Sequence, residues 1–248
     1  MADPSRDLTA PARALAVGAH PDDVEFGAGA TVAKWAALGC EVSIVICTDG
    51  SKGTWDPQAD LASLVATRQR EARAAADALG ATGEVVFLGR VDGELANDRP
   101  TRSALAAAIR RLRPDVLLGH DPWKRYRLHP DHRAAGFLTC DALVAARDPH
   151  FFPEHGIEHH RPSALLLFEA DEPDHAETVS EQHLATKLAA LESHRSQFES
   201  TMFVAATGAE GSAELDRFRH TVRSRVAEAG RWAGVDRAER FRSMPTDR

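Results

Sequence analysis

Two short segments of the chain carry side chains that bind metal ions and transfer protons. They are HPDD at 20–23 and HPDH at 129–132. Their imidazole and carboxylate groups suit Zn²⁺, with ligand distances of about 2.0 to 2.2 Å. Neither segment contains cysteine, which structural zinc sites often use, so the composition favours a catalytic zinc that keeps one position open for water. Mg²⁺ or Ca²⁺ would prefer oxygen ligands throughout.

The elements around these segments predict how they are positioned. Short continuous apolar runs at 13–19 and 42–47 are typical of parallel strands that are buried on both faces. Similar runs at 84–88, 115–120 and 163–169 alternate with helical patterns. The expected helices span 30–38, 60–79, 103–112, 131–147 and 181–194.

This alternation predicts an α/β, Rossmann-like three-layer fold with a mostly parallel sheet. In open sheets of this kind, ligands bind beyond the carboxyl ends of the strands, where the strand order reverses. HPDD follows the first expected strand, and HPDH comes after the fourth, which is its neighbour in the usual doubly wound order. We therefore expect the two segments, which place His20 and His132 112 positions apart, to form one site.

The chain of 248 residues is expected to form a single domain over 1–248, with its core at about 13–200. The remaining residues, 201–248, show no strand pattern. Residues 213–229 are expected to form a docked amphipathic C-terminal helix. The stretch from Gly230 onward is rich in Arg, Asp and Glu, and we expect a loosely held tail.

Composition excludes several classes of protein. Acidic residues outnumber basic ones by 37 to 30, and the net charge of −7 argues against binding of nucleic acid. No apolar run approaches the roughly 18 residues of a membrane span, and residues 1–12 lack a signal-peptide core, which predicts a cytoplasmic chain. The three cysteines lack metal-site spacing and are expected to be reduced packing residues. The chain also lacks the motifs of serine hydrolases, P-loop proteins and dinucleotide-binding proteins.

The motifs resemble those of a known family. AHPDDVEFGAGA at 19–30 and LHPDHRAAG at 128–136 are similar to signatures of the LmbE-like (PIG-L) zinc-dependent N-deacetylases. Members of this family act on N-acetylglucosaminyl and related amides, including precursors and conjugates of mycothiol and bacillithiol. The resemblance runs from about Ala14 to Gln197 and includes TDGSKG at 48–53, Arg68 with Glu71, Asp92-Gly93, HDP at 120–122 and HRSQ at 194–197.

Position by position, the resemblance implies that His20, Asp23 and His132 bind the metal, which is Zn²⁺ or, on the same ligands, Fe²⁺. Asp22 would be the general base that takes a proton from zinc-bound water and returns it to the departing amine. His129 would stabilise the oxyanion. The implied enzyme is a hydrolase that removes acetyl from a small-molecule substrate, an N-acetyl amino sugar or its conjugate.

Weaker expectations concern the surroundings of this centre. Arg68 and Asp92 resemble substrate-contacting positions, although an arginine on a solvated helix face and an aspartate in an Asp-Gly turn are the plain alternatives. Asp121 is expected to orient either a ligand histidine or its own loop. His194 matches a family position, but a histidine that interacts favourably with the helix dipole at the end of a helix would give the same sequence pattern.

Substrate identity stays open. Trp55, Trp123 and Tyr126 lie in the loops expected around the crevice, where they either stack on a sugar or pack the loops against the body. Ser51 stands where thiol-cofactor members of the family carry glutamate, which argues against a mycothiol-type or bacillithiol-type substrate.

Two alternatives to this function remain. The same metal chemistry could cleave a larger amide of a thiol conjugate, or the protein could hold a metal as a small-molecule binding protein without turnover. Oligomers are common among members of the resembled family, so a homo-oligomer is favoured, with no contact residues indicated.

Overall fold

A computed structural model describes residues 3–205 and 207–246 of the chain. The described residues form an eight-stranded sheet in the order β1-β7-β8-β6-β5-β2-β3-β4. The strands are β1 (Ser5–Arg6), β2 (Arg13–Gly18), β3 (Glu41–Thr48), β4 (Val85–Arg90), β5 (Val116–His120), β6 (Ala164–Phe168), β7 (His175–Thr178) and β8 (Ala238–Pro245). The α-helices are α1 (Asp23–Ala37), α2 (Leu61–Leu79), α3 (Arg99–Leu112), α4 (Pro130–Arg147), α5 (Glu181–Ser193) and α6 (Gly208–Ala233).

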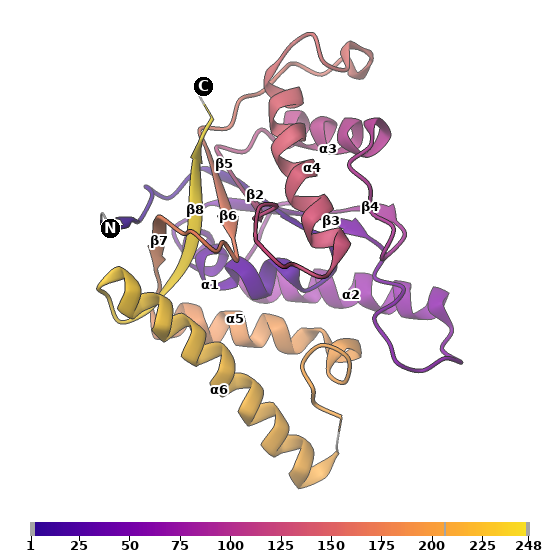
Figure 1. The fold of residues 1–248 in the computed structure, drawn as a ribbon, viewed down its shortest axis with the longest axis vertical. Helices are drawn as coiled ribbons and strands as arrows, with labels where there is room; N and C mark the ends of the chain where they lie inside the picture. Colours follow the sequence, from indigo (N-terminus) through magenta and orange to yellow (C-terminus); the bar gives the residue numbers. More distant parts are fainter. Residues whose placement is uncertain (1–2, 206, 247–248) are drawn as a thin grey trace.

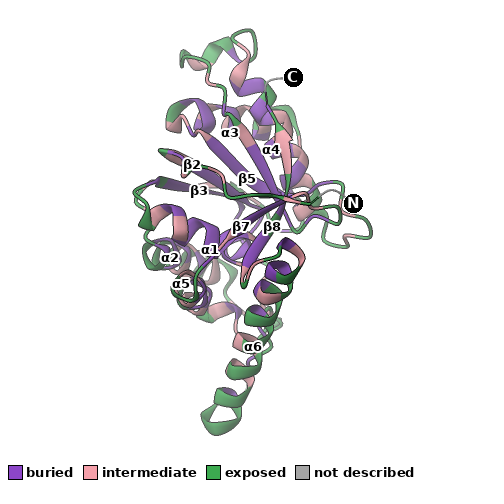
Figure 2. Cartoon of the chain, turned by 90° about the vertical axis from the view of Figure 1, so that its left-hand side faces the viewer, coloured by how far each residue is buried: buried purple, intermediate pink, exposed green. Residues whose placement is uncertain are grey.

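Helices cover both faces of the sheet, as Figure 1 shows. Side chains alternate along each strand, so Ala14 and Ala16 of β2 pack with the core under α1, α2 and α5, whereas Leu15 and Val17 pack with the core under α3 and α4. The expected α/β three-layer fold with a mostly parallel sheet and a C-terminal helix is confirmed. Figure 2 shows the strands buried between these layers.

The strand order reverses between β2 and β5. Both pair in parallel, with Ala14 opposite Val116 and Ala16 opposite Leu118, while β3 lies on the other side of β2. The chain therefore proceeds from β2 to β3 and β4 in one direction, and from β5 to β6 in the other. This reversal confirms the predicted neighbourhood of the first and fourth expected strands, and it brings two connecting loops to one edge of the sheet.

Helix α1 begins at Asp23, seven positions before the expected start at residue 30. The prediction was wrong because Gly27 and Gly29 weaken the helical pattern of this segment. Their lack of a side chain has a packing reason. A Cβ at Gly27 would overlap the Phe168 ring, and a Cβ at Gly29 would lie 3.1 Å from Lys187 Cγ.

The C-terminal stretch is not a loosely held tail, and this expectation is corrected. Residues Ala238–Pro245 form β8, which lies antiparallel between β6 and β7. Phe241 is fully buried there, opposite Phe168 of β6. The charged residues of β8 fall on both faces of the strand: Glu239 shares the face of Phe241, and Arg240 and Arg242 share the other. The sequence therefore shows no period of two that would predict a strand.

The expected C-terminal helix is present as α6, and its apolar residues pack against α5 through Val222 and Val226. Among residues 3–205 and 207–246, no helix combines the length and apolar character that a membrane crossing requires. The organisation of 1–248 as a single domain stays a prediction.

Candidate metal centre and catalytic site

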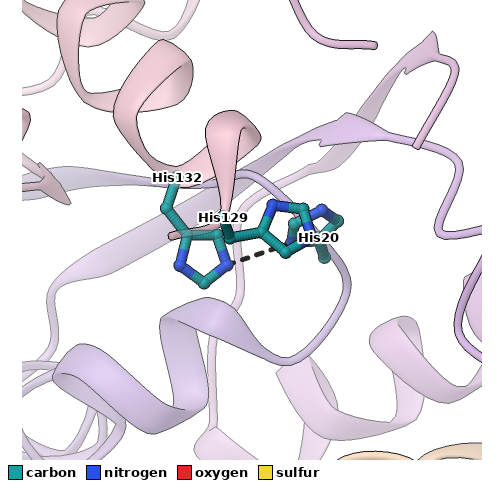
Figure 3. A group of neighbouring side chains, drawn as sticks. All are labelled: His20, His129 and His132. Carbon is teal, nitrogen blue, oxygen red and sulfur yellow. Dashed lines mark hydrogen bonds between the residues drawn. The ribbon is translucent and has the colours of Figure 1, made fainter. Parts of the chain in front are cut away.

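The structure brings HPDD and HPDH together. HPDD follows β2 directly, and its last residue is the first of α1. HPDH starts at His129, the N-cap of α4, after the loop that follows β5. His132 Nε2 lies 3.2 Å from His20 Nδ1, and Figure 3 shows the rings of His20, His129 and His132 gathered at one point. The predicted convergence of the two segments is present in the structure.

Three side chains offer ligand atoms at spacings that suit one metal ion. His20 Nδ1 and His132 Nε2 are 3.2 Å apart, and Asp23 lies 3.3 Å from each of them, through Oδ2 to His20 and through Oδ1 to His132. Tetrahedral zinc with bonds of about 2.0 to 2.2 Å would space its ligand atoms roughly 3.3 to 3.6 Å apart. The side chains therefore fit a zinc ion with little movement.

Other ligand-type side chains surround this set. Three overlapping groups of side chains that could hold a metal occur in the described part of the chain. They are His20, His129 and His132; Asp23, His120 and His132; and His20, Asp92 and Asp131. His20 and His132 each belong to two of these groups, which makes them the shared centre of the cluster.

The far side of the His20 ring faces two carboxylates. Its Nε2 lies 3.2 Å from both Asp131 Oδ2 and Asp92 Oδ1. A proton on Nε2 donated to either carboxylate leaves Nδ1 as the nitrogen that faces His132 and Asp23. Asp131 is itself fixed, because its oxygens accept hydrogen bonds from the backbone N–H groups of Gly93 and Leu95. These contacts fix the orientation of the His20 ring, with Nδ1 facing His132 and Asp23.

Asp23 is held as a carboxylate. Burial opposes its ionisation, but the imidazoles of His132 and His120 outweigh burial and keep its pKa well below 3.8. Its Oδ2 also accepts a hydrogen bond from the backbone N–H of His20 at 2.7 Å. An anionic oxygen beside two imidazoles is a suitable ligand set for a divalent cation.

Asp22 lies beside this ligand set in a different environment. It is the N-cap of α1, with a left-handed backbone at φ 105°, which is rare for a residue with a side chain. Its Oδ2 is buried, has no hydrogen-bond partner among the described residues, and lies 3.5 Å from Arg68 Nη2. Burial raises the pKa of Asp22 to about 6, although the Arg68 charge opposes this effect. The carboxyl can therefore exchange a proton near neutral pH.

His129 lies on the more exposed side of the cluster. Its ring centroid is 4.6 Å from that of His20 and 4.9 Å from that of His132. Partial burial, together with the charges of His20 and His132, lowers its pKa below 6.5. Its Nδ1 accepts the backbone N–H of Asp131 at 3.3 Å, which leaves the proton of a neutral ring on Nε2.

The expected outer residues lie near the centre, with contacts of their own. Arg68 is buried rather than solvated, and it donates to the carbonyl oxygens of Pro21 and Gly50 at 2.7 and 2.9 Å. Asp92 faces His20 and also accepts the backbone N–H of Lys52. Both side chains are already bonded to the protein, so their contact with substrate hydroxyls stays a prediction.

Asp121 acts on its own loop. Its Oδ1 accepts the backbone N–H of Trp123 at 2.9 Å, which is the second of the two expected arrangements. Trp123 packs edge-on against Phe137 while remaining 55% exposed, and Trp55 and Tyr126 are 73% and 94% exposed. Packing against the body therefore accounts for only one of the three loop aromatics.

The structure also places two histidines whose roles the sequence left open. His120, which ends β5, is buried; its Nε2 lies 3.1 Å from Asp23 Oδ2, and its Nδ1 accepts from Arg127 Nη1 at 3.0 Å. His194 is buried, and its Nε2 lies 3.6 Å from Glu25 Oε1. Burial acts to lower the pKa of His194, but Glu25 outweighs burial and raises this pKa above 6.5. The position of His120 at the end of a parallel strand was the available signal.

Comparison with known protein families agrees with this geometry. A family model for PIG-L, described as GlcNAc-PI de-N-acetylase, matches residues 15–143, which include both the HPDD and HPDH segments.

Curated relatives and a solved structure are also similar. The diacetylchitobiose deacetylase of Thermococcus kodakarensis is 34% identical over 189 residues, covering 75% of this chain and 70% of the relative. The 1D-myo-inositol 2-acetamido-2-deoxy-alpha-D-glucopyranoside deacetylase of Actinosynnema mirum is 33% identical over 233 residues, covering 77% of this chain and 82% of the relative. The structure of N,N'-diacetylchitobiose deacetylase from Pyrococcus horikoshii has a TM-score of 0.83 and 29% identity, covering 95% of this chain and 85% of that one.

Proposed function

This chain belongs to the PIG-L family, and on that premise we propose that it is a metal-dependent hydrolase that removes the N-acetyl group of an amino sugar or amino-sugar conjugate. The names of its relatives support this substrate class, because both describe deacetylases of N-acetylated sugars. The observation that carries the proposal is the meeting of His20, Asp23 and His132 beside the buried Oδ2 of Asp22, which has no hydrogen-bond partner among the described residues.

His20, Asp23 and His132 are the proposed metal ligands. Two imidazole nitrogens and a carboxylate, with no thiolate, favour zinc in a catalytic setting, and Fe²⁺ accepts the same ligands. When bound, the metal polarises the acetyl carbonyl and lowers the pKa of water to about 7. The contacts of His20 with Asp92 and Asp131 support its orientation for this role.

Asp22 is the proposed general base. Its carboxyl, with a pKa raised by burial to about 6, takes a proton from the water that attacks the acetyl carbon. The same carboxyl then gives this proton to the nitrogen as the C–N bond breaks. The amine and acetic acid leave, the acid ionises to acetate by giving its proton to the amine or to solvent, and Asp22 is again a carboxylate.

His129 is the proposed partner of the carbonyl oxygen during attack. Negative charge builds on that oxygen in the transition state, and a donor placed to meet it lowers the barrier. Because the Asp131 N–H occupies Nδ1, the neutral ring of His129 still donates from Nε2. The lowered pKa of His129 supports this neutral form near pH 7.

Release of acetate and of a primary amine from defined substrates tests the proposal. Zinc-loaded protein is incubated with N-acetylglucosamine, diacetylchitobiose, an N-acetylglucosaminyl inositol and, as a comparison, a longer-chain N-acyl glucosamine. We expect equal amounts of acetate and amine from at least one N-acetyl substrate, and release by Asp22→Asn that is slower by about a hundredfold or more. Turnover of the longer amide alone would favour the larger-amide alternative. Retained zinc without any release would favour a binding protein.

A further inference from the structure

Helix α1 carries the proposed ligand Asp23 in its first turn, and two side chains from elsewhere bond to its backbone just after that turn. Within α1, which is continuous from Asp23 to Ala37, the Phe26 C=O and the Ala30 N–H are four residues apart, the spacing of one helical hydrogen bond. Both of these backbone groups are bonded by side chains. Lys187 Nζ donates to Phe26 O at 2.8 Å, and Glu239 Oε1 accepts from Ala30 N at 3.1 Å.

The two side chains form a buried ion pair. Lys187 comes from α5 and Glu239 from β8, and Lys187 Nζ lies 2.6 Å from Glu239 Oε1. Each residue is only 4% exposed. Glu239 Oε2 accepts a further hydrogen bond, from Thr31 N at 2.7 Å. Buried charges are costly unless they are paired and hydrogen-bonded, and this pair meets both conditions by bonding to the backbone of α1.

The small residues of α1 make room for the pair. A Cβ at Gly29 would lie 3.1 Å from Lys187 Cγ, so a larger residue there would push the lysine stem away. Gly27 allows the Phe168 ring of β6 to lie against the same part of the helix. The GAG sequence at 27–29 therefore permits both contacts.

We infer that Lys187 and Glu239 are positioning residues that fix the first turn of α1, and with it Asp22 and Asp23, relative to HPDH. Because the pair bonds to three backbone groups of α1, at Phe26, Ala30 and Thr31, it fixes this part of the helix to α5 and β8. Strand β8, near the C-terminal end, is thereby part of the machinery of the metal centre. The inference rests on the proposed function only in taking Asp23 as a metal ligand.

The test compares Glu239→Gln with Glu177→Gln. Glu177 is a matched control because it is also a buried carboxylate bonded to a lysine of α1, Lys34 at 2.8 Å, but at the last turn of the helix. Zinc affinity is measured by competition with a chromophoric chelator, at a temperature where circular dichroism shows both variants folded. We expect Glu239→Gln to weaken zinc binding by about tenfold or more, the loss typical when a partner that orients ligands is removed. Glu177→Gln should stay within about twofold of the original chain, because its pair lies away from the ligands.

Equal losses in the two variants, or unchanged zinc affinity in a folded Glu239→Gln, would overturn the inference. If Glu239→Gln does not fold, Lys187→Met combined with Glu239→Gln removes both charges and is judged by the same tenfold criterion. For a substrate that is turned over, kcat should fall more than KM changes, since Asp22 and Asp23 move rather than substrate contacts. Zinc affinity requires no substrate, so an absence of acetate release would contradict the proposed function and leave this result standing.

Discussion

Asp22 and Asp23 are neighbours in the chain with opposite protonation behaviour. Burial raises the pKa of Asp22 to about 6, with Arg68 acting against it. Burial also opposes the ionisation of Asp23, but His132 and His120 hold its pKa well below 3.8. Two carboxylates whose environments push their pKa values apart are suited to two roles, one that exchanges a proton and one that stays anionic. This difference supports Asp22 as base and Asp23 as ligand.

Substitutions separate these two roles. Asp22→Asn should lower kcat by about 10²- to 10⁴-fold, the usual contribution of a general base, while zinc content stays near that of the original chain. His132→Ala should lose zinc as well as activity, because it removes a ligand atom. Metal analysis by mass spectrometry and an amine-release assay on the same samples measure both effects. Unchanged turnover in Asp22→Asn would show that the base is another residue.

We expect His120 to position Asp23, and a substitution can isolate this role. It contacts Asp23 with one ring nitrogen and Arg127 with the other. His120→Gln should weaken zinc binding by about 10- to 100-fold, as loss of partners that orient ligands does. The exposed His150→Gln is the control and should bind zinc like the original chain. Equal zinc affinity in His120→Gln and His150→Gln would contradict this role.

At the scale of residues, local motifs predicted which side chains meet, but not how they are oriented. HPDD and HPDH pointed to the cluster because strand order dictates where their loops lie. That His20 turns Nε2 toward Asp92 and Asp131 depends on packing across the sheet. The bond between Asp121 and its own loop likewise required coordinates, since the sequence allowed two arrangements.

Among the elements, the strands β2 to β6 could be predicted because their apolar runs are continuous; all of them except the partly buried edge strand β4 are buried on both faces. Two elements were misjudged for a shared reason. Glycines in the early part of α1 weaken its helical pattern, and charges in β8 weaken its strand pattern. Contacts with residues far away in the chain stabilise both elements in the fold. Lys187 of α5 serves both, because it fits against Gly29 and neutralises Glu239. No local pattern reveals such a contact.

Near the edge of the sheet, the ionisation of Glu177 should make the free energy of unfolding depend on pH. Glu177 of β7 is buried and bonded to His175 and to Lys34 of α1. Burial opposes its ionisation, but His175 and Lys34 lower its pKa in the folded chain below the ordinary 4.5. A lowered pKa stabilises the fold above about pH 4.5, and this contribution is lost as the pH falls through the folded value.

Glu177→Gln should therefore reduce the free energy of unfolding by about 1–3 kcal/mol at pH 7. The difference from the original chain should hold between pH 7 and 5 and shrink below about pH 4.5. Urea unfolding followed by circular dichroism at several pH values measures it. A difference that does not change down to pH 3 would contradict the assigned ionisation of Glu177.

At the scale of the whole molecule, the proposed metal joins segments that are far apart in the chain. Its ligands come from the start of α1 and from α4, and His20 and His132 are 112 positions apart. A ligand that binds only the folded state stabilises it by about 2.7 kcal/mol at 100 times its dissociation constant. Added zinc should thus raise the melting temperature by roughly 5–10 °C for a chain of this size.

A chelator should reverse this rise in melting temperature, and His132→Ala should show none of it. Differential scanning calorimetry with and without zinc measures both. An equal rise in His132→Ala would mean that zinc binds elsewhere on the molecule.

Anomalous X-ray scattering at the zinc edge, from crystals grown with zinc, would locate the metal itself. We expect one strong peak in each chain, within about 2.2 Å of His20 Nδ1, Asp23 and His132 Nε2, with Asp22 beside it. Zinc peaks only at other residues, or separate ions bound to His20 and to His132, would disprove the proposed shared metal site.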